Sequence, residues 1–168
     1  RDAQESRGLG DVYKRQIENN LNDNYQIIWS AGAQNYEKIK QQLASKQINI
    51  DNIRNTKILP YIYNMQEIMQ ISDLVVCRSG AMTITEIAIL GKPAIFIPFP
   101  FATENHQEYN AQVLKNVGSA EIIQDKNLTY TSLNKSCGKR DSYLPPLAIF
   151  RASAQSMCSP APLCAWYT

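Results

Sequence analysis

Apolar and polar residues alternate along this chain in short blocks that follow two different periods. Short apolar runs recur between residues 26 and 123 and are typical of buried strands. The longer stretches between them place apolar residues three or four positions apart, as on one face of a helix. The expected strands are 26–30, 57–62, 74–77, 94–97 and 120–123, and the expected helices are 35–47, 65–71, 82–90 and 106–117, with a further helix starting near Thr129.

Two glycines mark where expected helices end. Gly91, followed by Pro93, closes the helix before the fourth strand, and Gly118 closes the helix before the fifth.

Strands that alternate with helices predict an α/β fold: a Rossmann-like parallel sheet with helices on both faces. Ligands of such sheets bind at the carboxyl ends of the strands, so the loops after Leu59, Cys77 and Ile97 are the candidate functional loops.

Both ends of the chain depart from this pattern. Residues 1–16 are polar and have no period that leads into the first strand, while residues 136–168 bring together three of the four cysteines and half of the eight prolines. We therefore expect one domain over residues 17–135, incomplete at both ends. The segments 1–16 and 136–168 are expected to be foreign to the domain or to be disordered natural tails.

Composition narrows the classes of function. The net charge of +2 argues against nucleic acid as a partner. No apolar run is long enough for a transmembrane segment, and residues 1–16 lack the apolar core of a secretory signal. A single histidine and no paired acidic residues predict no metal site, and no cofactor motif occurs. Cys77, inside an apolar run, fits a buried thiol in a reducing cytoplasm.

The loop after the third strand has the composition of an anion site. Gly80 allows a tight turn and the close approach of a ligand, and the helix that follows at once directs the amides of residues 81–83 outward. A diphosphate suits that site, and Glu86, one turn further on, would reach the hydroxyls of an attached ribose. The alternative is an ordinary strand–helix turn, with Ser79 as the cap and Glu86 as a first-turn acid.

Two further loops carry candidate binding residues. The loop after the fourth strand is long, and it delivers His106 and Gln107 to a helix start where they would meet sugar hydroxyls. Asn110, one turn on, would hold the loop. After the second strand, Tyr61 and the Ile62 backbone would line a flat base. The alternatives are a packing histidine and a buried strand end with an aromatic cover.

These motifs together resemble a known family. Residues 58–123 are similar to the C-terminal domain of the MurG-type family, whose members are glycosyltransferases of two Rossmann-like domains (the GT-B fold), and a weaker similarity extends from about 25 to 134. The similarity rests on residues 72–83, 86–88, 91–94 and 105–111. It implies that the Ile62 backbone contacts uracil, that residues 81–83 hold the diphosphate, that Glu86 binds ribose and that His106 and Gln107 contact N-acetylglucosamine. The full set of expected substrate-binding residues is Ile62, Arg78, Ser79, Gly80, Ala81, Met82, Thr83, Glu86, His106, Gln107 and Asn110.

The resemblance also implies an activity for a longer protein. The family transfers N-acetylglucosamine from UDP to a lipid-linked muramoyl pentapeptide with inversion, at the cytoplasmic face of the bacterial plasma membrane, where it is a peripheral enzyme. It needs no metal, because helix N-termini stabilise the leaving diphosphate. The general base is expected from an N-terminal acceptor domain that this chain lacks, so we expect weak donor binding and no turnover here.

Two other functions remain open from the sequence. One is a single-domain donor subunit of a dolichol-linked N-acetylglucosaminyltransferase, a family that shares the Gly-Lys-Pro strand and the His-Gln helix start. The other is a non-catalytic nucleotide-sugar-binding module. The run from Cys77 to Thr83 favours the bacterial enzyme over the first of these.

Overall fold

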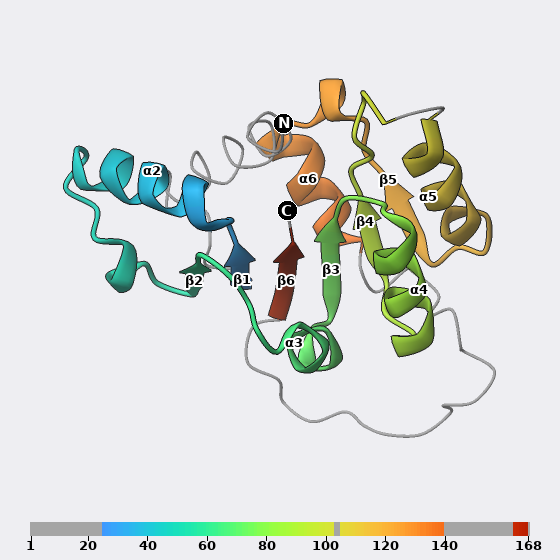
Figure 1. Cartoon of the computed structure of the whole chain (residues 1–168), viewed down its shortest axis with the longest axis horizontal. Helices are drawn as coiled ribbons and strands as arrows, with labels where there is room; N and C mark the ends of the chain where they lie inside the picture. The colour runs from blue at the N-terminus through green and yellow to red at the C-terminus, as the bar shows by residue number, and fades with distance from the viewer. Residues whose placement is uncertain (1–24, 103–104, 140–162, 168) are drawn as a thin grey trace.

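The fold is a single parallel sheet whose order reverses part-way along it. The computed structural model describes residues 25–102, 105–139 and 163–167 (Figure 1). Its strands are β1 (Gln26–Ser30), β2 (Thr56–Leu59), β3 (Leu74–Cys77), β4 (Ala94–Phe96), β5 (Ala120–Ile122) and β6 (Leu163–Tyr167). All strand pairs are parallel, and the order across the sheet is β2-β1-β6-β3-β4-β5. The α/β class predicted from the sequence is confirmed.

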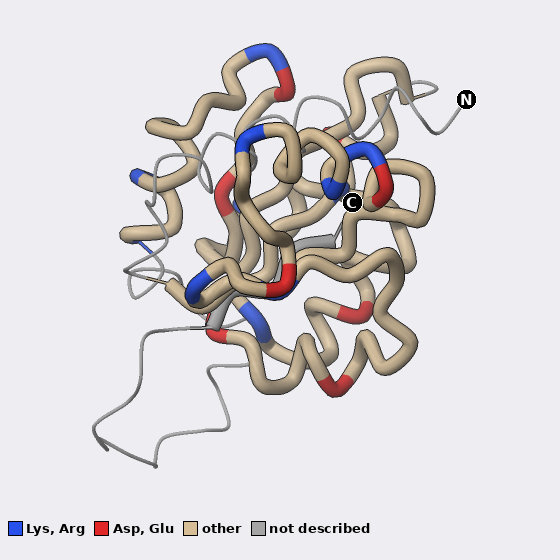
Figure 2. The backbone as a smooth tube through the Cα atoms, turned by 90° about the vertical axis from the view of Figure 1, so that its left-hand side faces the viewer, with Lys and Arg blue, Asp and Glu red and all other residues tan. Residues whose placement is uncertain are grey.

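Helices cover both faces of this sheet. They are α2 (Ala33–Ala44), α3 (Met65–Ile71), α4 (Ala81–Leu90), α5 (His106–Asn116) and α6 (Tyr130–Gly138), together with the short 3-10 turns η2 (Ile50–Asn52) and η4 (Asp125–Asn127). The longest, α2, has 12 residues, and no helix among the described residues has the length and apolar character to cross a bilayer. Figure 2 shows acidic and basic residues scattered along the described backbone rather than gathered by sign.

Two apolar cores hold the layers together. On one face, Ile27, Trp29, Val76 and Ile95 pack with residues of α2 and α6, among them Leu43 and Leu133. On the other face, buried residues of β3, β4 and β5 pack against α3, α4 and α5: Val75, Cys77, Ala94, Phe96 and Ala120 meet Met69, Ile87, Ala111 and Leu114. Strands buried on both faces explain why their sequences read as continuous apolar runs.

Glycine ends two helices as the sequence predicted. Gly91 adopts the left-handed conformation after α4, with φ of 64°, and Gly118 does so after α5, with φ of 74°. The amide of Lys92 then bonds the Ile87 carbonyl at 3.2 Å, which satisfies one of the carbonyls that a helix end leaves open. The resulting turns send the chain directly into β4 and β5.

Several element ends differ from the predicted ones, and the largest differences are in β2 and in α2, which ends at Ala44 rather than at residue 47. β2 stops at Leu59 rather than at residue 62, because Pro60 has no amide proton to continue the ladder. α2 begins at Ala33, two residues before the expected start, after Gly32 with φ of 77°.

One strand lies in a segment that was set apart from the domain. β6 falls inside residues 136–168, yet its backbone runs between β1 and β3, pairing Ile28 with Ala165 and Val75 with Ala165. The end of α6 also lies in this range, and Cys137 is buried in the first core. Residues 1–16 lie outside the described residues, and the expected domain limits of 17 and 135 stay predictions.

Candidate functional site

The turn between β3 and α4 lies at the carboxyl ends of the strands. It is close to the point where the order of the strands across the sheet changes direction. Gly80 is the cap of α4, and no side chain bonds the amides of the first turn. The first helical bond runs from the Ile84 amide to the Gly80 carbonyl, at 3.0 Å. The amides of Ala81, Met82 and Thr83 are therefore without partners among the described residues, as the first turn of an uncapped helix leaves them. Their partial positive charge suits an anion.

The backbone conformation at position 80 does not require a glycine. Its φ of −64° and ψ of 149° are available to any residue, so the tight-turn role expected from the sequence is not needed. A Cβ built at this position meets nothing nearer than the Thr83 hydroxyl at 3.9 Å. A Cβ would therefore fit among its protein neighbours at position 80, and close approach of a ligand is the remaining reason for a glycine.

Ser79 binds another loop instead of capping α4. Its buried hydroxyl donates to the Gln107 carbonyl at 2.7 Å, and its own carbonyl accepts from the Asn110 side-chain amide at 3.3 Å. These two bonds join the β3–α4 turn to the first turns of α5. Asn110 was expected to hold its own loop, and it holds the neighbouring turn instead. The arrangement keeps the Ser79 hydroxyl away from the α4 amides.

Arg78 points toward the start of the β4–α5 loop. Its Nη1 donates to the carbonyls of Ile97 at 3.0 Å and Pro98 at 3.3 Å, and it pairs with Asp125 Oδ1 at 2.7 Å. The guanidinium carbon lies 5.8 Å from the centre of the Phe99 ring, within the range of a cation–π contact. Arg78 therefore connects the turn after β3 to the loops after β4 and β5.

The β4–α5 loop carries Gln107 in a fixed position. The Phe99 amide donates to Gln107 Oε1 at 2.9 Å, so the side-chain oxygen is engaged within the loop. His106, the first residue of α5, has an exposed side chain and follows Asn105, which has a left-handed φ of 56°. The hydrogen bonds described so far bring Arg78, Ser79, Gln107 and Asn110 together; His106 shares their edge of the sheet through its place in the topology.

Two other predicted residues lie on α4 and beyond β2. Glu86 is half-buried and sits three positions after Thr83, on the same side of α4, with no hydrogen bond or ion pair among the described residues. Ile62 is buried on the segment that follows the carboxyl end of β2, between the exposed rings of Tyr61 and Tyr63, whose centres are 5.0 Å apart. Topology places this segment at the same edge of the sheet as the other loops.

Asp125 is a residue of the site that sequence reasoning missed. It opens η4, just beyond the carboxyl end of β5, and its side chain is 27% exposed against 14% for Arg78. Next to it, the Gln124 side-chain amide donates to Glu108 Oε1 at 2.8 Å. An acidic residue three positions after a parallel strand was the available signal, because the loop there belongs to the ligand-binding edge.

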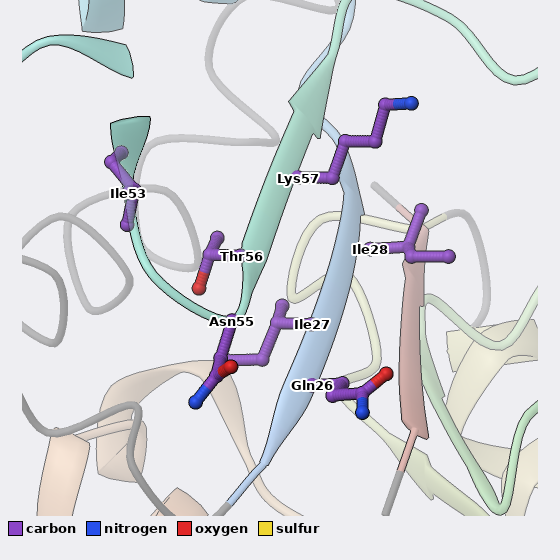
Figure 3. A pocket seen from close by; sticks show the side chains of 7 residues that line it. All are labelled: Gln26, Ile27, Ile28, Ile53, Asn55, Thr56 and Lys57. Carbon is purple, nitrogen blue, oxygen red and sulfur yellow. The ribbon is translucent and has the colours of Figure 1, made fainter. Parts of the chain in front are cut away.

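A cavity and a buried cysteine of the described residues do not add to this site. A cavity of about 320 Å³ opens near the amino ends of β1 and β2, lined by Gln26, Ile27, Ile28, Ile53, Asn55, Thr56 and Lys57 (Figure 3). It lies at the opposite end of these strands from the loops above. Burial raises the pKa of the Cys77 thiol, which is typical of a structural cysteine. No three acidic, His or Cys side chains in the described ranges gather as metal ligands would.

Comparison with known proteins decides the family. The model of the glycosyltransferase family 28 C-terminal domain matches residues 9–161. The chain belongs to this family. The resemblance given by the sequence motifs is thereby confirmed, and the described residues 25–102 and 105–139 lie within the matched range, whereas β6 lies just beyond it. The matched range also extends beyond the domain limits expected from the sequence.

Curated relatives of this family 28 domain share one name. UDP-N-acetylglucosamine--N-acetylmuramyl-(pentapeptide) pyrophosphoryl-undecaprenol N-acetylglucosamine transferases are 45% identical over 104 residues in Desulforamulus reducens and 38% identical over 128 residues in Bacillus cytotoxicus. The matches cover 62% and 76% of this chain but 28% and 34% of the relatives. The chain thus spans about a third of the length of the curated relatives it matches.

Solved structures agree with the family 28 assignment. MurG of Acinetobacter baumannii superposes with a TM-score of 0.66 at 29% identity, over 86% of this chain and 40% of that protein. A glycotransferase of kitacinnamycin superposes with a TM-score of 0.50 at 18% identity, over 69% of this chain and 34% of that protein, which shows a common fold alone.

Proposed function

We propose that this domain binds UDP-N-acetylglucosamine as the donor half of an inverting glycosyltransferase. In the longer protein, the sugar would pass to undecaprenyl-diphospho-muramoyl-pentapeptide during peptidoglycan synthesis. The observation that carries this proposal is the set of amides at the start of α4 that have no partners among the described residues. The names of the relatives support the identity of donor and acceptor.

The chemistry of the proposed site follows from where charge develops. When the acceptor hydroxyl displaces UDP, the bond from the anomeric carbon to the β-phosphate oxygen breaks and negative charge moves onto the diphosphate. Amides fixed at the start of a helix stabilise that charge without reorganising. We assign this role to the amides of Ala81, Met82 and Thr83. The proton of the acceptor hydroxyl would go to a base in the part of the longer protein that this chain does not span.

The remaining predicted residues take recognition roles in this proposal. Glu86, which has no hydrogen bond or ion pair within the part of the chain that the structure describes, would accept hydrogen bonds from the ribose hydroxyls. His106 and Gln107 would contact the N-acetylglucosamine, and the Ile62 backbone would contact the uracil. Arg78, Ser79 and Asn110 would hold the loops, as their bonds within the domain suggest. The lipid-linked acceptor implies a peripheral location at the cytoplasmic face of the bacterial plasma membrane.

Substitution of Gly80 by alanine tests the proposal. The new Cβ has room within the protein, with its nearest neighbour at 3.9 Å, but it enters the space assigned to the diphosphate. We expect the Kd for UDP-N-acetylglucosamine to rise about tenfold or more, a loss of about 1.4 kcal/mol, while the melting temperature stays unchanged or rises. NMR titration suits the weak binding expected of this chain.

A matched control is available at the end of α6. Gly138→Ala introduces the same group with the same clearance, 3.9 Å from the Tyr25 hydroxyl, at an exposed position outside the site. It should leave the Kd unchanged. If Gly80→Ala and Gly138→Ala bind the donor alike, the anion site is not where we place it.

The two alternative functions differ from the proposed one in turnover and in acceptor, not in the donor titration. A non-catalytic module would bind the nucleotide sugar equally well, but the longer protein would release no UDP when given the lipid-linked acceptor. A dolichol-linked donor subunit would use a polyprenol of different saturation as acceptor. The undecaprenol acceptor named for the bacterial relatives favours the first-named function.

A further inference from the structure

Three loops at the ligand-binding edge are tied together by one cation. Arg78 follows β3, its carbonyl partners Ile97 and Pro98 begin the loop after β4, and Asp125 follows β5. The side chain is mostly buried, so the charge of the guanidinium needs a partner within the protein. Asp125 supplies it, and a charged hydrogen bond of 2.7 Å is among the stronger polar contacts a protein makes.

The turn after β5 holds the start of α5 as well. Gln124 donates to Glu108, so adjacent residues of one turn reach both Arg78 and the first turn of α5. Between these two points lies the β4–α5 loop, whose Phe99 amide bonds Gln107. Fixing the loop at its beginning through Arg78 and at its end through Glu108 restricts where Gln107 and His106 can lie.

We propose that Asp125 is a positioning residue for the sugar part of the donor, and that it acts through Arg78. This inference rests on the proposed function and deepens it. Because Nη1 of Arg78 is engaged by Asp125 and by the carbonyls of Ile97 and Pro98, we assign this cation to bracing the sugar-binding loop rather than to the diphosphate. The amides of α4 alone would meet the charge of the diphosphate. Ordering a loop before the ligand arrives raises the affinity by raising the fraction of protein that is ready to bind.

The proposal predicts different changes in Kd for two ligands, UDP and UDP-N-acetylglucosamine. UDP uses the amide site and should be nearly insensitive to the clasp formed by Arg78 and Asp125. UDP-N-acetylglucosamine also uses the loop that the clasp holds. We expect Asp125→Asn to raise the Kd for UDP-N-acetylglucosamine about fivefold and to change the Kd for UDP less than about twofold, within the coupling range of one polar network.

The experiment is an NMR titration of the 168-residue chain with each ligand. Glu121→Gln is the matched control, because Glu121 is also 27% exposed and also pairs with a cation, Lys139 at 3.3 Å, away from these loops. It should change neither Kd. If Asp125→Asn strengthens UDP binding, Arg78 has been released to bind the diphosphate and the proposal is overturned. Equal Kd changes for both ligands overturn it as well.

A second variant protects the test against misfolding. Gln124→Ala removes the exposed hydrogen bond to Glu108 at the other end of the loop, where little stability is at stake. It should weaken UDP-N-acetylglucosamine binding in the same selective way, about twofold. If Asp125→Asn fails to fold and Gln124→Ala shows no selectivity, the positioning role is refuted. If the unmodified chain binds neither ligand, the proposed function fails instead.

Discussion

Proline at the first position of α4 would remove one amide of the proposed diphosphate site and nothing else. Ala81 makes no helical hydrogen bond through its amide, because the first such bond in α4 belongs to Ile84. Proline suits this position, since its fixed φ is already helical, and the preceding Gly80 has the extended conformation that proline requires of its neighbour. Ala81→Pro should therefore fold as stably as the unmodified chain.

The expected loss of affinity follows from the bond removed. A hydrogen bond from a neutral donor to a charged acceptor contributes about 1.5–3 kcal/mol, so the Kd for UDP-N-acetylglucosamine should rise about 10- to 150-fold. NMR titration measures the Kd, and circular dichroism melting checks the fold. Ala33→Pro is the control, because Ala33 is likewise an exposed alanine that starts a helix after a glycine. An unchanged Kd in correctly folded Ala81→Pro would refute the anion site.

Three further outcomes are expected. Glu86→Gln should weaken UDP binding about fivefold and 2′-deoxy-UDP binding less, measured by the same titration, because the deoxy ligand retains one of the two ribose hydroxyls that the carboxylate accepts from. A chain that ends at Lys139 lacks β6 and should melt at a lower temperature, because β6 pairs with β1 and β3; an equal melting temperature would instead support the predicted domain limit at 135. Burial raises the pKa of the Cys77 thiol. The buried, protonated thiol therefore contributes its full stabilisation below about pH 8.5, the pKa of a cysteine in the unfolded chain, and this stabilisation is lost as the pH rises further. The folded thiol should also resist alkylation at pH 8.

The sequence pattern predicted the strands that helices cover on both faces. β3 and β4 are covered on both faces, so their apolar runs are legible in the sequence. β6 was not predicted, because a strand of five residues after a proline-rich stretch carries no period of its own. Its place between β1 and β3 depends on partners more than 80 residues away in the chain. Local pattern holds no information about pairing at that range.

The sequence predicted where the site lies but not the hydrogen bonds that connect its loops. A strand that runs through Cys77 into Ser-Gly and then a helix implies free amides on general grounds, and the structure has them. The partners of Arg78 and Ser79 were beyond the sequence, because each lies 19 to 47 residues away on another loop. A side chain that reads as a ligand contact can equally bind a neighbouring loop, and only the folded geometry distinguishes the two.

The proposed donor site draws on a compact stretch of the chain. Apart from the Ile62 backbone, which follows β2, its amides, loops and clasp follow β3, β4 or β5. The core on one face of these strands is built from residues 69 to 120 without a contribution from β1 or β2. Those two strands pack on the other core, with α2 and α6. β3 and β4 contribute to both cores, whereas β1 and β2 contribute to the first core alone, so loss of β6 should loosen β1 and β2 before it disturbs the loops of β3 to β5. Hydrogen exchange on the chain ending at Lys139 would show this order as early exchange at Trp29 and late exchange at Phe96.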